Sequence, residues 1–99
     1  EDYFVIKPKH SAFFETGLDL LLKYLEVENL VIVGMAGDNC VYFTAADAYL
    51  RDYGLFIPSD CTFPISPAEN RDALKRMRKI LKVDTTPASK LLRRKRLLV

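Results

Sequence analysis

One cysteine of this chain has the sequence surroundings of a nucleophile. Cys40 follows a glycine-bearing turn, residues 34–39, which separates the apolar run Leu30–Val33 from a stretch rich in small residues that predicts a helix. A thiol at a helix N-terminus meets exposed backbone N–H groups and the positive end of the helix dipole, and both favour the thiolate. The same N–H groups can hold an oxyanion. The pattern alone leaves two interpretations open: a catalytic thiol, or a small buried apolar residue.

A lysine is expected at the same edge of the fold. Lys7 follows Tyr3–Ile6, an apolar run that predicts a buried strand stopped by Pro8. Ligands of parallel α/β sheets bind at the carboxyl ends of the strands, and both Lys7 and the turn before Cys40 follow strands. A lysine near a thiol favours its thiolate or carries protons. The alternative interpretation of Lys7 is a solvated surface charge.

Three helices are predicted from apolar periodicity and capping residues. The first carries leucines at 18, 21, 22 and 25 on one face, with Thr16 as its N-cap. The second runs from Cys40 to Asp52 and is closed by Gly54. The third starts at Ser66-Pro67 and runs to about Lys82. Its buried side is expected to hold Ala73, Leu74, Met77, Ile80 and Leu81.

The strands between these helices complete an alternating pattern. The run Leu30–Val33 has no alternating polar residue, which is typical of a central parallel strand covered on both faces. Residues 55–58 predict the next strand, and Val83-Asp84 a brief edge strand. A last helix is expected from Thr86-Pro87 to Leu98. The order β-α-β-α-β-α predicts an α/β fold, a three-layer α/β/α sandwich with a parallel sheet.

Composition limits the class of protein. The chain has 99 residues, 49% hydrophobic and 28% charged, which is typical of one globular domain. Its apolar runs are too short to cross a bilayer, so we expect no membrane insertion. Two cysteines and one histidine are too few for a disulfide framework or a Cys/His zinc site. We therefore expect a cytoplasmic protein with no bound metal and no cofactor.

Charge divides the chain into two parts. Residues 1–89 hold ten basic and thirteen acidic side chains, whereas residues 90–99 hold five basic ones and no acid. The acidic body argues against a nucleic-acid-binding core. The tail from Lys90 to Val99 has four consecutive cations between leucine pairs. It can be a solvated end, an arm that packs in an oligomer, or a segment that touches acidic lipid or RNA.

Three segments in order resemble one known superfamily. They are Val5-Ile6-Lys7-Pro8-Lys9-His10-Ser11-Ala12-Phe13, then Leu30 through Val41, then Thr44-Ala45-Ala46-Asp47-Ala48. Together they resemble the isochorismatase-like cysteine hydrolases, which include nicotinamidases, N-carbamoylsarcosine amidohydrolases and isochorismatases. The resemblance runs from about Asp2 to Asp84 and implies residues 1–89 as one domain part, followed by the basic tail 90–99.

The resemblance implies a catalytic triad of Asp, Lys and Cys. Cys40 matches the nucleophile and Lys7 the lysine. The family also has a non-proline cis peptide, here Met35–Ala36, which would aim the N–H groups of Ala36 and Cys40 at an oxyanion. His10, Ser11 and Phe13 are candidates for the wall of the substrate pocket.

Other parts of the family pattern fall outside the matched motifs. The family's aspartate lies on a first strand that precedes the matched region, as do the ligands of its metal-binding members. The resemblance therefore implies the C-terminal half of the domain, with two of three catalytic residues and no activity alone. The expected function is hydrolysis of a small amide or related C–N bond through a thioester. The alternative is a truncated, non-catalytic family member that acts in interaction or oligomerisation. The expected partners are a small-molecule substrate and further copies of the chain.

Overall fold

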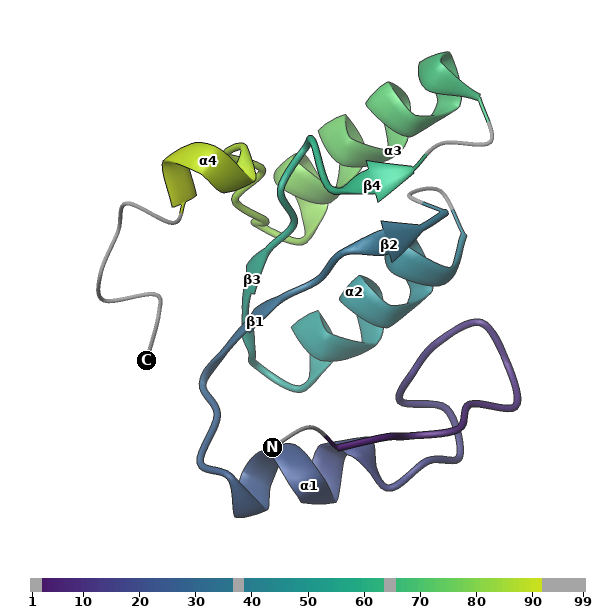
Figure 1. Ribbon diagram of the computed structural model, residues 1–99, viewed down its shortest axis with the longest axis vertical. Helices are drawn as coiled ribbons and strands as arrows, with labels where there is room; N and C mark the ends of the chain where they lie inside the picture. The colour runs from purple at the N-terminus through teal and green to yellow at the C-terminus, as the bar shows by residue number, and fades with distance from the viewer. Residues whose placement is uncertain (1–2, 37–38, 64–65, 92–99) are drawn as a thin grey trace.

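The computed structural model describes residues 3–36, 39–63 and 66–91 (Figure 1). In this part of the chain two pairs of short strands lie between the first three helices, and a fourth helix follows. The helices are α1 (Leu18–Tyr24), α2 (Cys40–Leu50), α3 (Pro67–Ile80) and α4 (Ala88–Leu91). The strands are β1 (Asn29–Val31), β2 (Gly34–Met35), β3 (Gly54–Phe56) and β4 (Thr62–Phe63).

All strand pairs are parallel. β1 pairs with β3, so that Leu30 lies beside Leu55, and β2 pairs with β4. Between these ladders Ile32 N–H donates to the Phe56 carbonyl at 2.8 Å. A single parallel bridge joins Phe56 to Asp84, which confirms the predicted edge strand as one bridge rather than a longer ladder. Parallel neighbours need a crossover, and α2 and α3 supply it.

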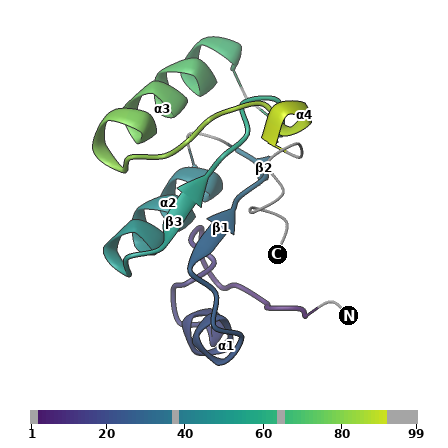
Figure 2. The same cartoon turned by 90° about the vertical axis from the view of Figure 1, so that its left-hand side faces the viewer.

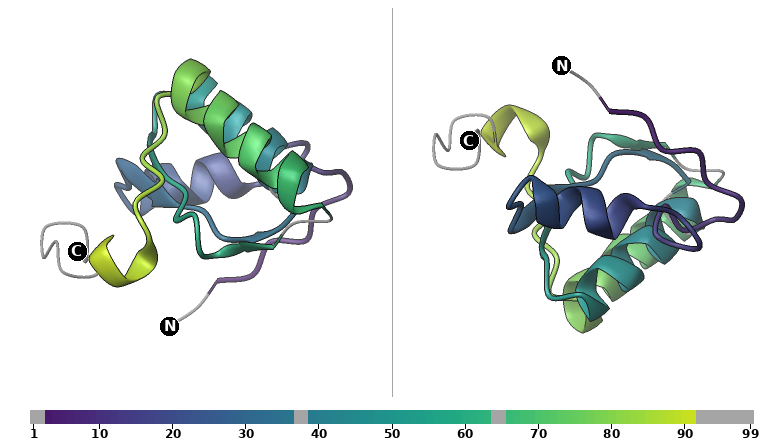
Figure 3. Two further views of the ribbon diagram at one scale, coloured as in Figure 1. Left: turned by 90° about the horizontal axis from the view of Figure 1, so that it is seen from above. Right: turned by 90° about the horizontal axis from the view of Figure 1, so that it is seen from below.

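Helices lie on both sides of the strands. α2 and α3 cover one side, and α4 lies on the other (Figures 2 and 3). The core between the strands and the two long helices is built from fully buried side chains that include Ala45, Ala48, Ile57 and Met77. Leu18 and Leu22 attach α1 to this core. This arrangement confirms the predicted α/β/α class, with α4 alone as the third layer among the described residues.

The predicted first strand is wrong for the described structure. Residues 3–7 form no strand, and the side chains of Phe4 and Ile6 are 92% and 94% exposed. An apolar run becomes a strand only where a neighbouring strand accepts its backbone hydrogen bonds. No described strand pairs with residues 3–7.

The run from Leu30 to Val33 is covered by helices on one face only, whereas the sequence predicted cover on both faces. Leu30 and Ile32 pack against the core, but Val31 and Val33 are 52% and 57% exposed. Successive side chains of a strand point to opposite faces. Because α4 is the one described helix on the second side, that face stays uncovered over these residues.

The helix starts and ends predicted from the sequence are confirmed only in part. Ser66 caps α3, since its Oγ accepts from Glu69 N–H at 3.5 Å, which confirms the predicted start. The same helix ends at Ile80, whose side chain is exposed rather than on the predicted buried face. At α1 the N-cap is Gly17 instead of Thr16, although Thr16 Oγ1 accepts from Leu18 N–H at 3.3 Å.

The end of α2 was predicted at the wrong residue. The helix stops at Leu50, and the left-handed residue after it is Asp52, with φ 66°. Gly54 instead begins β3, where a Cβ atom would collide with the side chain of Asn29. The glycine thus allows a close approach between two paired strands rather than a helix end.

Each of the three longer helices is followed by a charged residue in the left-handed conformation. The residues are Glu26 after α1, Asp52 after α2 and Lys82 after α3, with φ between 57° and 66°. All three take the position that glycine most often fills.

Part of the predicted C-terminal helix lies beyond the described residues. α4 covers Ala88–Leu91, whereas residues 92–99, with most of the basic tail, are not described. Among the described helices none combines the length and apolar character needed to span a membrane.

Candidate active site

The turn between β2 and α2 presents the sulfur of Cys40. The Met35–Ala36 peptide is cis, as the resemblance implies. Ala36 is buried, and its carbonyl accepts from Asn39 N–H at 3.0 Å and from Val41 N–H at 3.1 Å. These bonds hold the turn against the first residues of α2. Cys40 is the first helical residue and is half-buried, and the Asn39 side chain makes no capping hydrogen bond.

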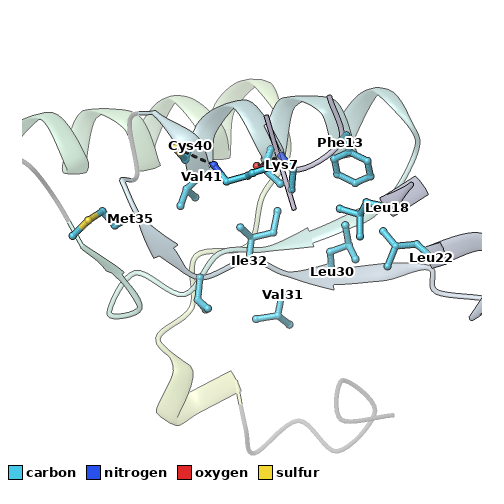
Figure 4. A pocket seen from close by; sticks show the side chains of 13 residues that line it. Lys7, Phe13, Leu18, Leu22, Leu30, Val31, Ile32, Met35, Cys40 and Val41 are labelled. Carbon is cyan, nitrogen blue, oxygen red and sulfur yellow. Dashed lines mark hydrogen bonds between the residues drawn. The ribbon is translucent and has the colours of Figure 1, made fainter. Parts of the chain in front are cut away.

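Lys7 and Cys40 lie together although 33 positions separate them. The Lys7 Nζ donates to the Cys40 Sγ at 3.6 Å (Figure 4). It also donates to the carbonyls of Lys9 at 3.3 Å and His10 at 3.2 Å. Three acceptors therefore orient one ammonium beside the thiol. The structure shows this predicted proximity, whereas the catalytic roles of the two residues stay predictions.

The other predicted pocket residues have different places. Ser11 is buried, and its Oγ accepts from Phe13 N–H at 3.1 Å, so it stabilises a turn. His10 is exposed, with its ring centroid 5.7 Å from that of Phe43. Neither is among the residues that line the cavity next to Cys40, whereas Phe13 is. The place of His10 and Ser11 in the wall of a substrate pocket therefore stays a prediction.

Phe13 combines a core role with a place in the cavity wall. Its ring stacks on that of Tyr53 at 6.1 Å between centroids. The Arg51 guanidinium lies 5.0 Å from the centroid of the Phe13 ring and pairs with Asp47 at 3.4 Å. Tyr53 in turn donates to the Asp19 carboxylate at 2.8 Å. The segment after Lys7 is thus packed against both α1 and the end of α2.

The cavity beside Cys40 is mainly apolar. Its volume is about 370 Å³. Its described lining is Lys7, Ala12, Phe13, Leu18, Leu22, Leu30, Val31, Ile32, Val33, Met35, Cys40, Val41 and Thr44 (Figure 4). This lining contains one cation and no carboxylate. Within the described ranges no three His, Cys, Asp or Glu side chains gather as metal ligands.

Sequence reasoning gave Thr44 no role in the site. Thr44 Oγ1 accepts from Ala12 N–H at 3.0 Å and lines the cavity. The spacing of Thr44 could have indicated a role, because a residue four positions after Cys40 lies on the same face of α2. Its partner, 32 positions earlier, could not be found from spacing.

The second cysteine has an acidic neighbour. Cys61 Sγ donates to Asp60 Oδ1 at 3.6 Å, and the same oxygen accepts from Ala88 N–H at 2.8 Å. The hydrogen bond from Ala88 lowers the pKa of Asp60 below its ordinary value. Burial, and then the charge of Asp60, raise the pKa of the Cys61 thiol. This cysteine therefore stays protonated at neutral pH.

Comparison with known proteins finds similarity to one protein family. The family model described as "Isochorismatase domain" matches residues 1–88. The uncharacterized isochorismatase family protein YaaI of Bacillus subtilis is 47% identical over 91 residues, 92% of this chain. The ureidoacrylate amidohydrolase RutB of Acinetobacter baylyi is 35% identical over 69 residues, 70% of this chain.

A solved structure shows the same fold. The isochorismatase-like hydrolase from Alkaliphilus metalliredigens superposes on 94% of this chain with a TM-score of 0.89 and 27% sequence identity. The matched region is half of that protein, half of YaaI and 28% of RutB. The chain thus spans half or less of the length of these relatives.

Proposed function

This chain belongs to the isochorismatase family, and from that membership we propose that it supplies the nucleophile of a hydrolase that cleaves a small amide or related C–N bond. The observation that carries the proposal is the contact between Lys7 Nζ and Cys40 Sγ at 3.6 Å. A thiolate is the reactive form of cysteine, and an adjacent ammonium stabilises it. The similarity to an amidohydrolase supports the amide as the bond attacked.

The reaction proceeds in two steps. The Cys40 thiolate attacks the amide carbonyl, and the N–H groups of Ala36 and Cys40 receive the developing oxyanion. The tetrahedral intermediate collapses as the C–N bond breaks, and the amine leaves with a proton from a general acid. Water then attacks the thioester, which releases the carboxylic acid and restores the thiol.

Proton transfer needs a group that the described cavity does not hold. Its lining contains no carboxylate, and Lys7 is its one charged residue. We assign the general base to a carboxylate from outside the described residues, as the resemblance to the Asp-Lys-Cys hydrolases implies. The 99-residue chain is then expected to form a thioester with activated esters, whose leaving groups need no proton, but not to turn over amides.

A trapping experiment tests the nucleophile. The chain is incubated with a panel of small amides and activated esters, and its intact mass is measured. One acyl adduct is expected, present in a Cys61→Ala variant and absent from a Cys40→Ala variant. An adduct that persists without Cys40 contradicts the assignment.

A fusion experiment tests the missing base. The N-terminal half of the YaaI protein is fused before residue 1, and amide hydrolysis is compared with that of the chain alone. Multiple turnovers by the fusion, abolished by Cys40→Ala, are expected. Multiple turnovers by the 99-residue chain alone would show that the base lies within it.

A second candidate function is a non-catalytic interaction protein. It is favoured by the exposed apolar face of the strands, which includes Val31, Val33, Met35 and Phe63. Exposed apolar patches often bind other proteins or further copies of the same chain. Light scattering after size exclusion distinguishes the two functions in combination with trapping: a stable homo-oligomer without any Cys40 adduct supports the interaction protein.

A further inference from the structure

The segment that carries Lys7 has little structure of its own. Residues 3–17 contain no helix or strand. Among the described residues, the backbone groups of residues 3–10 make no hydrogen bond to another helix or strand. The Lys7 side chain is exposed and long, so its rotamers compete with the contact to Cys40. Something further along the segment must hold it over the thiol.

One hydrogen bond joins this segment to α2. Ala12 N–H donates to Thr44 Oγ1 at 3.0 Å, at a half-buried position. The carbonyl of the same residue accepts from Thr16 Oγ1 at 2.5 Å. Both polar groups of the Ala12 backbone are therefore bound, which fixes the segment five residues after Lys7.

Thr44 and the thiol are carried by one helix. Cys40 and Thr44 are separated by one helical turn and share a face of α2, and both line the cavity. An α-helix is stiff over one turn. The position of Thr44 therefore determines where the segment with Lys7 lies relative to the Cys40 sulfur.

We propose that Thr44 is a positioning residue, which keeps the Lys7 ammonium at the Cys40 thiolate through its hydrogen bond to Ala12. The proposal rests on the proposed nucleophile, but it concerns only the reactivity of the thiol. Alkylation of Cys40 measures that reactivity without hydrolysis. Failure of this proposal is therefore distinct from failure of the hydrolase, which the acyl adduct of Cys40 tests.

The first test compares two substitutions of Thr44. Thr44→Val keeps the branched shape and removes the acceptor, whereas Thr44→Ser keeps the hydroxyl. With neutral iodoacetamide at pH 7, Thr44→Val should lower the Cys40 alkylation rate about two- to threefold, which is the low end of the contribution of one hydrogen bond. Thr44→Ser should retain the original rate. All variants carry Cys61→Ala, so that only one thiol reacts.

Hydrogen exchange measures the hydrogen bond between Ala12 N–H and Thr44 Oγ1 directly. The Ala12 amide should exchange at least about threefold faster in Thr44→Val than in Thr44→Ser, because its acceptor is lost. Amides in α3, such as that of Met77, should exchange equally in both variants. Equal exchange at Ala12 in the two variants would overturn the proposal.

A double-mutant cycle separates positioning from general stability. Lys7→Met should lower the Cys40 alkylation rate about three- to fivefold, as expected for an exposed charge pair. If Thr44 acts through Lys7, Thr44→Val has no further effect in the Lys7→Met background. A merely structural role would lower the rate again in that background. That additive result, or an unchanged rate in Thr44→Val alone, overturns the proposal.

Discussion

The two cysteines occupy similar places with opposite neighbours. Cys40 follows β2 and Cys61 precedes β4, the strand paired with β2, and both side chains are half-buried. Each sulfur lies 3.6 Å from a charged group. At Cys40 that group is the Lys7 ammonium, which donates to the sulfur. At Cys61 it is the Asp60 carboxylate, which accepts from the sulfur.

This difference bears on the proposed role of Cys40 as the nucleophile. Position near a strand end and partial burial are common to both cysteines, so neither property distinguishes the proposed nucleophile. The sign of the adjacent charge does distinguish the two cysteines, because in general a cation favours a thiolate and an anion favours a thiol. Asp60 acts in the second way on Cys61, together with burial.

The largest expected effect is the difference between the cysteines themselves. With iodoacetamide at pH 7, Cys40 should react at least about tenfold faster than Cys61, because only its thiolate has a cationic neighbour. Peptide mapping by mass spectrometry at timed intervals measures both rates in one sample. Equal rates in the folded chain would refute the comparison, and equal rates in denaturant are the control.

Charge reversal at Lys7 should remove most of this difference. Lys7→Glu places a carboxylate beside Cys40, as Asp60 is beside Cys61, and the Cys40 rate should fall about fivefold or more. The same peptide mapping gives the ratio of the two rates. Lys9→Glu is the matched control, since Lys9 meets this site only through its backbone carbonyl. An equal loss in both variants would point to net charge instead.

Removing the acidic neighbour should have the reverse, smaller effect at Cys61. Asp60→Asn keeps an oxygen for Ala88 N–H but loses the charge that raises the pKa of Cys61. Burial, the larger cause of the raised pKa, remains. The Cys61 alkylation rate should therefore rise only about two- to threefold. No change at Cys61, with Cys40 as internal reference, would mean that Asp60 does not hold the thiol protonated.

The smallest expected effect is a pH dependence of stability. Because the pKa of Asp60 is lowered in the folded chain, ionised Asp60 stabilises the fold above its ordinary pKa of 3.8. This contribution is lost as pH falls through the lower, folded pKa. The melting temperature of the chain should therefore exceed that of Asp60→Asn at pH 7, and the gap should close below pH 3.8. A gap that persists in acid would contradict this linkage.

Local features of the fold were predictable from the sequence. The capping of α3 by Ser66 depends on residues within one turn, and the structure has it. By contrast, whether Tyr3–Ile6 forms a strand depends on a neighbour far along the chain. The exposed Val31 shows the same limit, since an apolar run does not say which face a helix covers.

The candidate site likewise has features that the sequence predicted and features that it did not. The juxtaposition of Lys7 and Cys40 was predicted from the matched motifs, and the hydrogen bond between them is present although the strand expected before Lys7 does not form. The place of Ser11 was not predictable, because its hydroxyl turns back to its own segment. Thr44 was missed because its partner Ala12 is fixed only by tertiary folding.

The charged residues that follow the helices open a route for protein engineering. Glu26, Asp52 and Lys82 hold a backbone conformation that costs every residue with a Cβ more than it costs glycine. None of the three lines the cavity beside Cys40. Glycine at each position is thus a candidate stabilising substitution that leaves the lining of this cavity unchanged. In directed evolution, a chain stabilised at these helix ends should tolerate destabilising substitutions around Cys40.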